Sequence, residues 1–340
     1  MRVTRYDEPE MGEYRARLYK TVFGLAAAYN VAFGMWAVLW PGSFFDLFRM
    51  EPPKYEAIWQ CLGMVVGLYG LLYAYGASRL DRAQPIVAIG FAGKVLGPIG
   101  WVLVVSSCEW PWRTYALVLF NDIIWWLPFG IFLLEGTKFG ERVRSSAPYI
   151  FALVNAAAAS AMLFILRGGM EIVSDPAVRA EYILENPFLW RGGWILWNAA
   201  GLSLLMFFAW WGARIRSSFW GIAACIVAGI GLASDLLAES LYIGWLPIEL
   251  DRIQPIGTFL TGGVANGLYT LAGIILTIRF SCLRGSLLIW TWAIWVSGIL
   301  LTASTIFGSV TGMIVSTALL MTLICPWAVV MGLRFGRMPR

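Results

Sequence analysis

The stretch FWGIAACIVAGIGLASDLLAESLYIGWLP, residues 219–247, decides how this chain folds. It is long and apolar enough to cross a bilayer as a helix, which takes about 20 residues, yet Asp235 and Glu239 lie near one end. Side chains four residues apart share one face of a helix. Because a carboxyl group at membrane depth is costly, such residues usually face a bundle interior or a wet cavity. The stretch predicts a spanning helix and makes these two acids the first candidates for a functional site.

The composition of the whole chain indicates a polytopic membrane protein. Of 340 residues, 59% are hydrophobic and 13% are charged, whereas roughly a quarter of the residues of a soluble domain carry charge. The opening residues mix both signs of charge and lack the order of a cleavable signal peptide. We therefore expect an all-α bundle whose first apolar run stays in the membrane.

Counting apolar runs of about 20 residues predicts ten spanning helices. The candidates are 21–40, 57–77, 85–107, 115–134, 148–166, 192–213, 219–243, 257–279, 286–307 and 311–333. Only residues 308–310 separate the last two runs, and Gly308 favours a tight hairpin there.

The distribution of basic residues predicts the orientation of the helices. The amino terminus and the even-numbered loops together hold most of the 25 Lys and Arg residues, and such an excess marks the cytoplasmic side. We expect a multi-pass protein of the inner (plasma) membrane with both termini in the cytoplasm.

The positions of charged segments and apolar runs divide the chain into four parts. Residues 1–20 are expected to form a cytosolic lead-in and residues 21–136 a four-helix membrane unit. The basic stretch at 137–147 is expected to be a cytoplasmic linker. Residues 148–340 then form a six-helix unit.

The first unit resembles the DoxX-like group of four-helix membrane proteins over roughly residues 15–136. The features that carry the resemblance are PGSFF after the first helix, Gly63, Gly67 and Gly70 in the second, and GFAGKVLGPIG in the third. The resemblance implies a four-helix fold, and some members of the group are associated with quinone-linked redox or oxidative-stress systems. It assigns no redox role to a named residue, and the six further helices depart from the pattern.

The longest predicted outer loop, residues 167–193, should contain a short surface helix. Ser174 or Asp175 followed by Pro176 is typical of a helix start, and Asn186-Pro187 of a stop. This helix would cover the cavity that Asp235 is expected to line.

Lys94 and Asp122 are the ionisable residues placed deep in the first unit. We interpret them as a buried ion pair, since a long lysine stem can reach a carboxyl group at another depth. Three roles stay open: fixing helix register, relaying a proton or ion, or contacting a lipid head group or ligand.

Asn198 and Asn266 are expected to orient Asp235 and Glu239, because all four are predicted in the outer half of the membrane. The cluster would bind substrate or couple its movement to a proton, since two close carboxyl groups hold a proton more tightly. The other interpretation places Glu239 at the interface, paired with Arg252 or Arg191.

Several classes of function and partner are set aside. The chain contains no histidine, which removes the commonest ligand of haem, zinc and copper, so we expect no cofactor and no metal site. The cytoplasmic loops account for the net charge of +5, so nucleic acid is not expected. Membrane lipid is the expected partner, with other membrane proteins or a second copy of the chain as further options.

Three functions remain as hypotheses. The first is an outward-facing polar pocket that binds or moves a small or lipid-like substrate, with proton coupling as one role of its acids. The second is a non-catalytic scaffold subunit of a larger membrane complex, and the third is an enzyme that modifies a lipid or isoprenoid. No catalytic motif selects among them.

Overall fold

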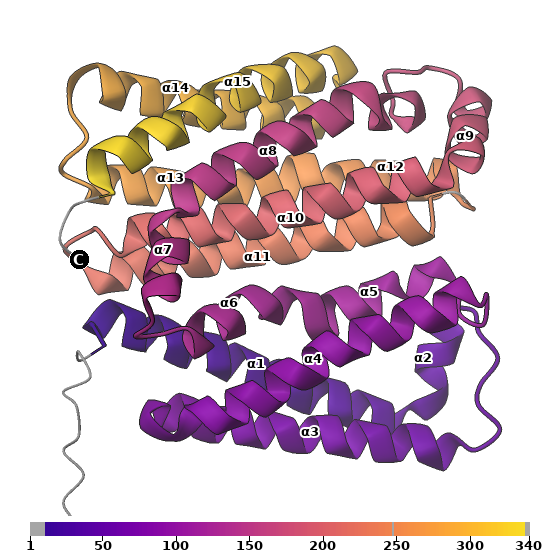
Figure 1. Ribbon diagram of the computed structural model, residues 1–340. Helices are drawn as coiled ribbons and strands as arrows, with labels where there is room; N and C mark the ends of the chain where they lie inside the picture. Colours follow the sequence, from indigo (N-terminus) through magenta and orange to yellow (C-terminus); the bar gives the residue numbers. More distant parts are fainter. Residues whose placement is uncertain (1–10, 247, 337–340) are drawn as a thin grey trace, which may run out of the picture. The chain divides into compact units, whose positions relative to one another are not determined.

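A computed structural model describes residues 11–246 and 248–336 and confirms the all-α fold class. Ten helices of the described residues are long and apolar enough to cross a membrane, and no strand occurs among these residues. Lipid offers the backbone no hydrogen-bond partner, so an apolar segment in a membrane must satisfy its own backbone hydrogen bonds. A helix does so, and the apolar composition of the chain therefore favours helical spans. Figure 1 shows that each spanning segment is a long helix.

The chain divides into two compact units, residues 1–141 and 142–340. The division falls inside α7 (Lys138–Ser145), a short helix in the stretch 137–147 that the sequence predicts to be a linker. Each unit contains its own packed helices, and each is described below by itself.

Unit 1 contains four spans and a short helix between the first two. Its elements are α1 (Glu13–Leu39), α2 (Pro41–Leu47), α3 (Glu56–Ser78), η1 (Leu80–Arg82), α4 (Ala83–Ser106), η2 (Trp112–Thr114), α5 (Tyr115–Val118), the π-helical turn η3 (Leu119–Ile123) and α6 (Ile124–Leu133). The segments η2, α5, η3 and α6 together make one span. The PGSFF stretch is thus the start of a short helix, α2, directly after the first span.

A seam of small residues holds α1 against α3. A Cβ atom at Gly34 would lie 2.6 Å from the backbone oxygen of Gly63, and one at Gly70 would lie 2.9 Å from the backbone oxygen of Ala27. Both distances are too short for a real side chain. The glycines that stand out in the sequence therefore let two backbones approach closely, as small residues do between membrane helices.

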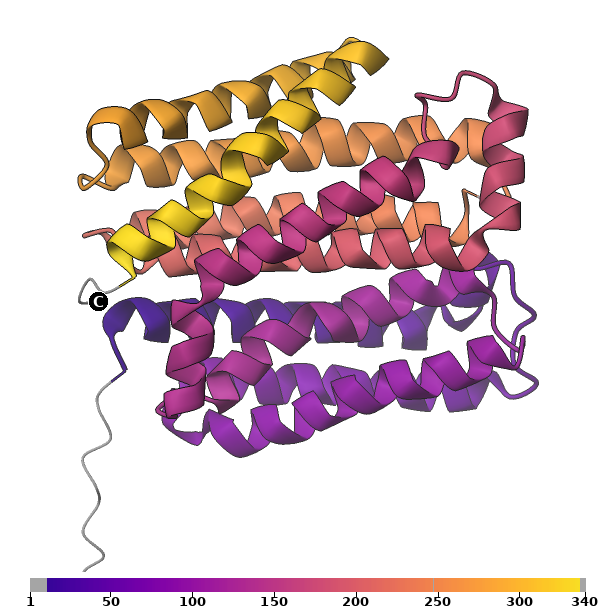
Figure 2. The ribbon, with the colours of Figure 1, turned by 45° about the horizontal axis from the view of Figure 1, so that its top comes forward.

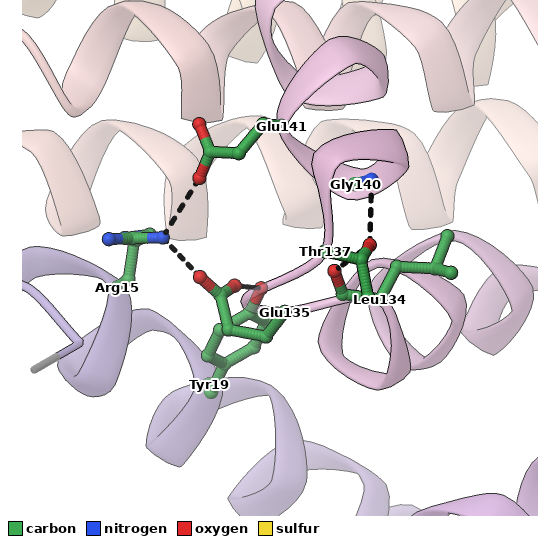
Figure 3. Close-up of polar contacts among 7 residues, drawn as sticks. All are labelled: Arg15, Tyr19, Leu134, Glu135, Thr137, Gly140 and Glu141. Carbon is green, nitrogen blue, oxygen red and sulfur yellow. Dashed lines mark hydrogen bonds and ion pairs between the residues drawn. The ribbon is translucent and has the colours of Figure 1, made fainter. Parts of the chain in front are cut away.

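The first helix begins at Glu13, inside the predicted lead-in, and a polar network fixes this end. Arg15 forms ion pairs with Glu135 and, at 3.7 Å, with Glu141, and the hydroxyl of Tyr19 donates to Glu135 at 2.7 Å. Figure 3 shows Arg15 and Tyr19 on α1 facing the connection between α6 and α7. The helix extends beyond the apolar run because these charges find partners there. Residues 1–10 of the lead-in lie outside the described residues.

Unit 2 contains six spans. Its elements are α8 (Ala147–Phe164), η4 (Leu166–Gly169), α9 (Pro176–Glu185), α10 (Pro187–Gly212), α11 (Ser218–Gly244), α12 (Leu250–Thr258), the π-helical turn η5 (Phe259–Ala265), α13 (Asn266–Arg279), α14 (Gly285–Ile306) and α15 (Val310–Phe335). The segments α12, η5 and α13 form one span. Figure 2 shows α10 and α11 side by side, with α8 running across them and α15 beside α14.

Two local predictions in unit 2 are confirmed. Helix α9 begins at Pro176, where the Asp175 side chain accepts a hydrogen bond from the Ala177 amide at 2.8 Å. Helices α14 and α15 are joined by a tight turn in which Gly308 has a φ of +65°. Glycine is favoured there because this left-handed conformation strains other residues.

Large apolar side chains cover the outer faces of both units. Examples that are more than half exposed are Leu68, Leu103, Leu153, Phe164, Phe188 and Ile289. So much exposed apolar surface is typical of helices that face lipid rather than water.

Candidate functional site

Asp235 and Glu239 are both buried inside unit 2. Asp235 is 7% exposed and Glu239 is 1% exposed, and both lie on α11 one turn apart. Burying carboxyl groups is costly unless polar groups surround them. Neither acid therefore points at open solvent. The polar groups around each carboxyl group are described next.

Glu239 is bonded by Asn198 on α10. The Asn198 side-chain nitrogen donates to the Glu239 carboxyl at 2.6 Å and to the backbone oxygen of Trp194 at 2.8 Å. In the described part of the chain Glu239 forms no ion pair with Arg252 or Arg191, the two partners of the other interpretation, and Arg252 is exposed and contacts Glu249 at 3.4 Å. Asn198 thus orients Glu239 and joins α10 to α11.

Among the described residues, Asp235 is hydrogen-bonded on one carboxyl oxygen. Its Oδ2 accepts a hydrogen bond from the Tyr269 hydroxyl on α13 at 3.2 Å, and the Thr261 side chain of η5 lies beside the carboxyl. Its Oδ1 is buried and has no hydrogen-bond partner among the described residues. Most buried polar atoms in proteins are bonded, so an orphaned carboxyl oxygen is a sign that something else binds there.

The π-helical turn η5 explains how Thr261 reaches this site. Such a turn widens a helix locally and is common at functional sites. Next to Thr261, a Cβ atom at Gly262 would lie 2.4 Å from the Thr305 hydroxyl of α14. The glycine therefore lets this widened turn pack against α14 while Thr261 faces Asp235.

Asp235 lines a cavity of about 780 Å³ that lies within unit 2. Most of the wall is apolar or aromatic, and the charged residues on it are Arg167, Glu171 and Asp235. Ligand sites are typically clefts of 300–1,000 Å³ with apolar walls and a few polar groups. The cavity therefore has the size and lining of a binding site for a small, mostly apolar molecule.

On one side, the cavity is lined by residues of α8 and α15 that are exposed at the surface of unit 2. Its wall there includes Ser160 and Leu163 from α8 and Ile314 and Ala318 from α15, and all four are exposed. A molecule dissolved in the bilayer would meet this side of the cavity first.

Two indole groups add unpaired donors to the wall. Trp194 and Trp197 both line the cavity, and the Nε1 atom of each is buried without a hydrogen-bond partner among the described residues. The Trp194 ring also packs on Tyr242, with ring centroids 4.4 Å apart. Asp235 therefore shares the cavity with several aromatic rings.

Glu171 belongs to a polar chain at the α9 end of the cavity. Its carboxyl accepts from the Thr258 hydroxyl at 2.5 Å, and that hydroxyl contacts the Tyr242 hydroxyl at 3.1 Å. The sequence does not single out Glu171, Thr261 and Tyr269 as site residues. Glu171 lies two residues after Gly169 in a predicted loop, and no sequence pattern places that loop over the cavity.

The candidate Asn266 lines the cavity but bonds α14 instead of an acid. Its side-chain nitrogen donates to the Gly298 backbone oxygen at 2.7 Å and to the Thr302 hydroxyl at 2.8 Å. The structure thus brings Asp235, Glu239 and Asn198 together, and leaves Asn266 as a link between α13 and α14.

Helix α9 is tied to α12. Arg179 is 9% exposed and donates to the Gln254 side chain at 2.5 Å, while Gln254 donates to the Gly169 backbone oxygen at 3.2 Å. The Tyr182 hydroxyl also donates to the backbone oxygen of Ile165. The predicted surface helix is therefore anchored by buried polar bonds.

In unit 1, Lys94 and Asp122 are both buried, and Asn121 lies between them. The Lys94 ammonium donates to the Asn121 backbone oxygen at 2.5 Å, and the Asn121 amide donates to the Asp122 carboxyl at 3.1 Å. The Lys94 ammonium also lies 5.8 Å from the centroid of the Trp125 ring. Where the sequence predicts a direct pair, Asn121 bridges the two charges, because the π-helical turn η3 carries both Asn121 and Asp122.

Unit 1 also has a cavity of about 920 Å³ beside the loop after α2. Its basic residues are Arg49, Lys54 and Arg113. Arg113 donates to the backbone oxygens of Phe48 and, at 2.8 Å, Arg49, so it braces the loop. The cavity of unit 2, which holds a buried and unpaired carboxyl oxygen, is the stronger candidate site.

Comparison of the chain with models of protein families, with curated proteins and with solved structures finds no match.

Proposed function

We propose that unit 2 binds a small amphiphilic, lipid-like molecule that it takes from the bilayer. The observation that carries this proposal is the unpaired Oδ1 atom of Asp235 in a cavity with apolar walls. A ligand with an apolar body would cover the walls, and its polar end would satisfy the carboxyl oxygen.

The route into the site supports a ligand from the membrane. The lining residues Leu163 of α8 and Ile314 of α15 are 57% and 42% exposed on a surface that faces lipid. An amphiphile would reach the cavity between these helices without crossing into water. In a transport role, the protein would move the same molecule from one leaflet of the bilayer to the other.

Photo-crosslinking tests the proposal. In phosphatidylcholine vesicles, a hexadecanol that carries a diazirine at mid-chain should label peptides from α10, η5 and α13, because these elements form the cavity wall. Labelling confined to outward-facing residues of the helices would contradict the proposal. Mass spectrometry of the peptides reads out either result.

We expect Ala318→Phe to lower labelling of the cavity peptides by roughly fivefold. Ala318 lines the cavity and is exposed, so a ring at this position blocks the side opening. The matched control is Leu319→Phe, since Leu319 is the next residue, is 44% exposed and does not line the cavity. Equal labelling of the two variants would show that the ligand does not use this opening.

We also propose that the protein lies in the inner membrane with both termini cytoplasmic. The distribution of Lys and Arg supports this orientation. It places Cys108 and Cys282, both exposed, on opposite sides of the membrane.

A membrane-impermeant maleimide should therefore modify Cys108 in intact cells. Cys282 should react only after the cells are opened. Single-cysteine variants that retain one or the other residue separate the two signals, and the reverse pattern would invert the orientation.

A further inference from the structure

We infer that the molecule bound in unit 2 carries a positively charged, hydrogen-bonding head, such as an alkylammonium group, that pairs with Asp235. This inference rests on the proposed function and adds the chemistry of the head group. Its basis is the surroundings of Asp235, a buried acid on the cavity wall that has no basic partner among the described residues.

Among the described residues, the two acids of α11 have no basic partner. Tyr269 donates to Asp235 and Asn198 donates to Glu239, and both donors are neutral. A buried carboxyl group in such surroundings either keeps its proton or pairs with a cation. Of the two acids, Asp235 lines the cavity, so a cationic ligand there pairs with the ionised form of Asp235.

The remaining charged groups of the cavity wall balance each other. Arg167 and Glu171 carry opposite charges, so together they add no net charge to the wall. Glu171 is already bonded by Thr258. Asp235 is therefore the acid that remains to attract a cation.

The numbers of hydrogen-bond donors and acceptors also favour a cationic head group. The unpaired Oδ1 of Asp235 accepts hydrogen bonds, and an alkylammonium group offers three donors. Bonds between charged partners are shorter and stronger than neutral ones. A ligand with an anionic head would instead place two like charges together.

The aromatic residues of the wall also suit a cation. Trp194, Trp197, Tyr242 and Tyr269 line the same cavity as Asp235. The face of an aromatic ring attracts an ammonium group, most strongly for tryptophan and most strongly away from water. Aromatic rings that share a cavity with an acid therefore suit the head of an organic cation.

Competition in the crosslinking assay tests the head group. Hexadecylammonium, hexadecanol and hexadecyl sulfate, each at the same mole fraction in the vesicles, compete with the photoreactive hexadecanol. We expect hexadecylammonium to compete about tenfold better than hexadecanol, which corresponds to about 1.4 kcal/mol, and hexadecyl sulfate to compete least. Equal competition by all three would overturn the inference while leaving the proposed function intact, whereas absence of cavity labelling would overturn both.

Asp235→Asn identifies the residue responsible. The amide keeps the size and hydrogen-bonding capacity of the side chain and removes its charge, so the preference for hexadecylammonium should fall to about that for hexadecanol. Asp251→Asn is the control, because Asp251 is an exposed acid on α12 outside the cavity. Retention of the full preference in Asp235→Asn would overturn the assignment of this carboxyl group.

Discussion

Gly34→Leu is expected to destabilise unit 1 by roughly 3 kcal/mol, at the upper end of the range for overpacked cores. The reason is that a Cβ atom at Gly34 meets backbone atoms of α3, at 2.6 Å from the Gly63 oxygen and 2.8 Å from the Gly67 nitrogen. A flexible side chain would move aside, but a helix backbone moves only with its whole helix. The apparent melting temperature in detergent, read from tryptophan fluorescence, measures the loss.

The control for this substitution lies on the same helix. Gly24→Leu adds the same side chain at a position where nothing lies within 4 Å of a new Cβ atom, so its melting temperature should stay close to that of the parent. If both variants melt at the same temperature, the close approach of α1 and α3 is not what holds the first unit together.

Asn198→Leu is expected to destabilise unit 2 by roughly 1–3 kcal/mol, the cost of leaving a buried polar group without its partner. Leucine has nearly the shape of asparagine but cannot donate to the Glu239 carboxyl, which now receives that bond at 2.6 Å. Glu239 is 1% exposed, so water cannot replace the lost donor without a rearrangement.

A double-mutant cycle isolates this contact from other effects of the substitution. In a Glu239→Leu background the acceptor is gone, so the further change Asn198→Leu should cost little. Glu239→Gln keeps an acceptor oxygen and should retain most of the stability. Additive losses in the double variant would mean that Asn198 and Glu239 contribute independently.

The sequence predicts the helical class, the spans and the depth of the two acids, because each depends on local composition. A run of about 20 apolar residues is long enough to cross lipid wherever it occurs, and Asp235 is conspicuous in such a run. The hairpin at Gly308 and the start of α9 at Pro176 are predictable for the same reason, since glycine and proline act on their immediate neighbours.

The partners of the acids depend instead on how helices distant in sequence meet. Tyr269 and Thr261 reach Asp235 because η5 is a π-helical turn, and nothing in FLTGGVA alone predicts that register. In unit 1, η3 likewise places Asn121 between Lys94 and Asp122.

Three hypotheses from the sequence stay predictions: the resemblance of the first unit to the DoxX-like group, the scaffold function and the enzyme function.

Binding of an amphiphile in unit 2 is tested most directly by an experimental map of the protein in lipid nanodiscs that contain hexadecylammonium. We predict elongated density in the cavity of unit 2, with its head within hydrogen-bonding distance of the Asp235 carboxyl and its tail toward the opening between α8 and α15. A cavity filled only by water, or closed by inward movement of the helices, would show that unit 2 does not bind an amphiphile.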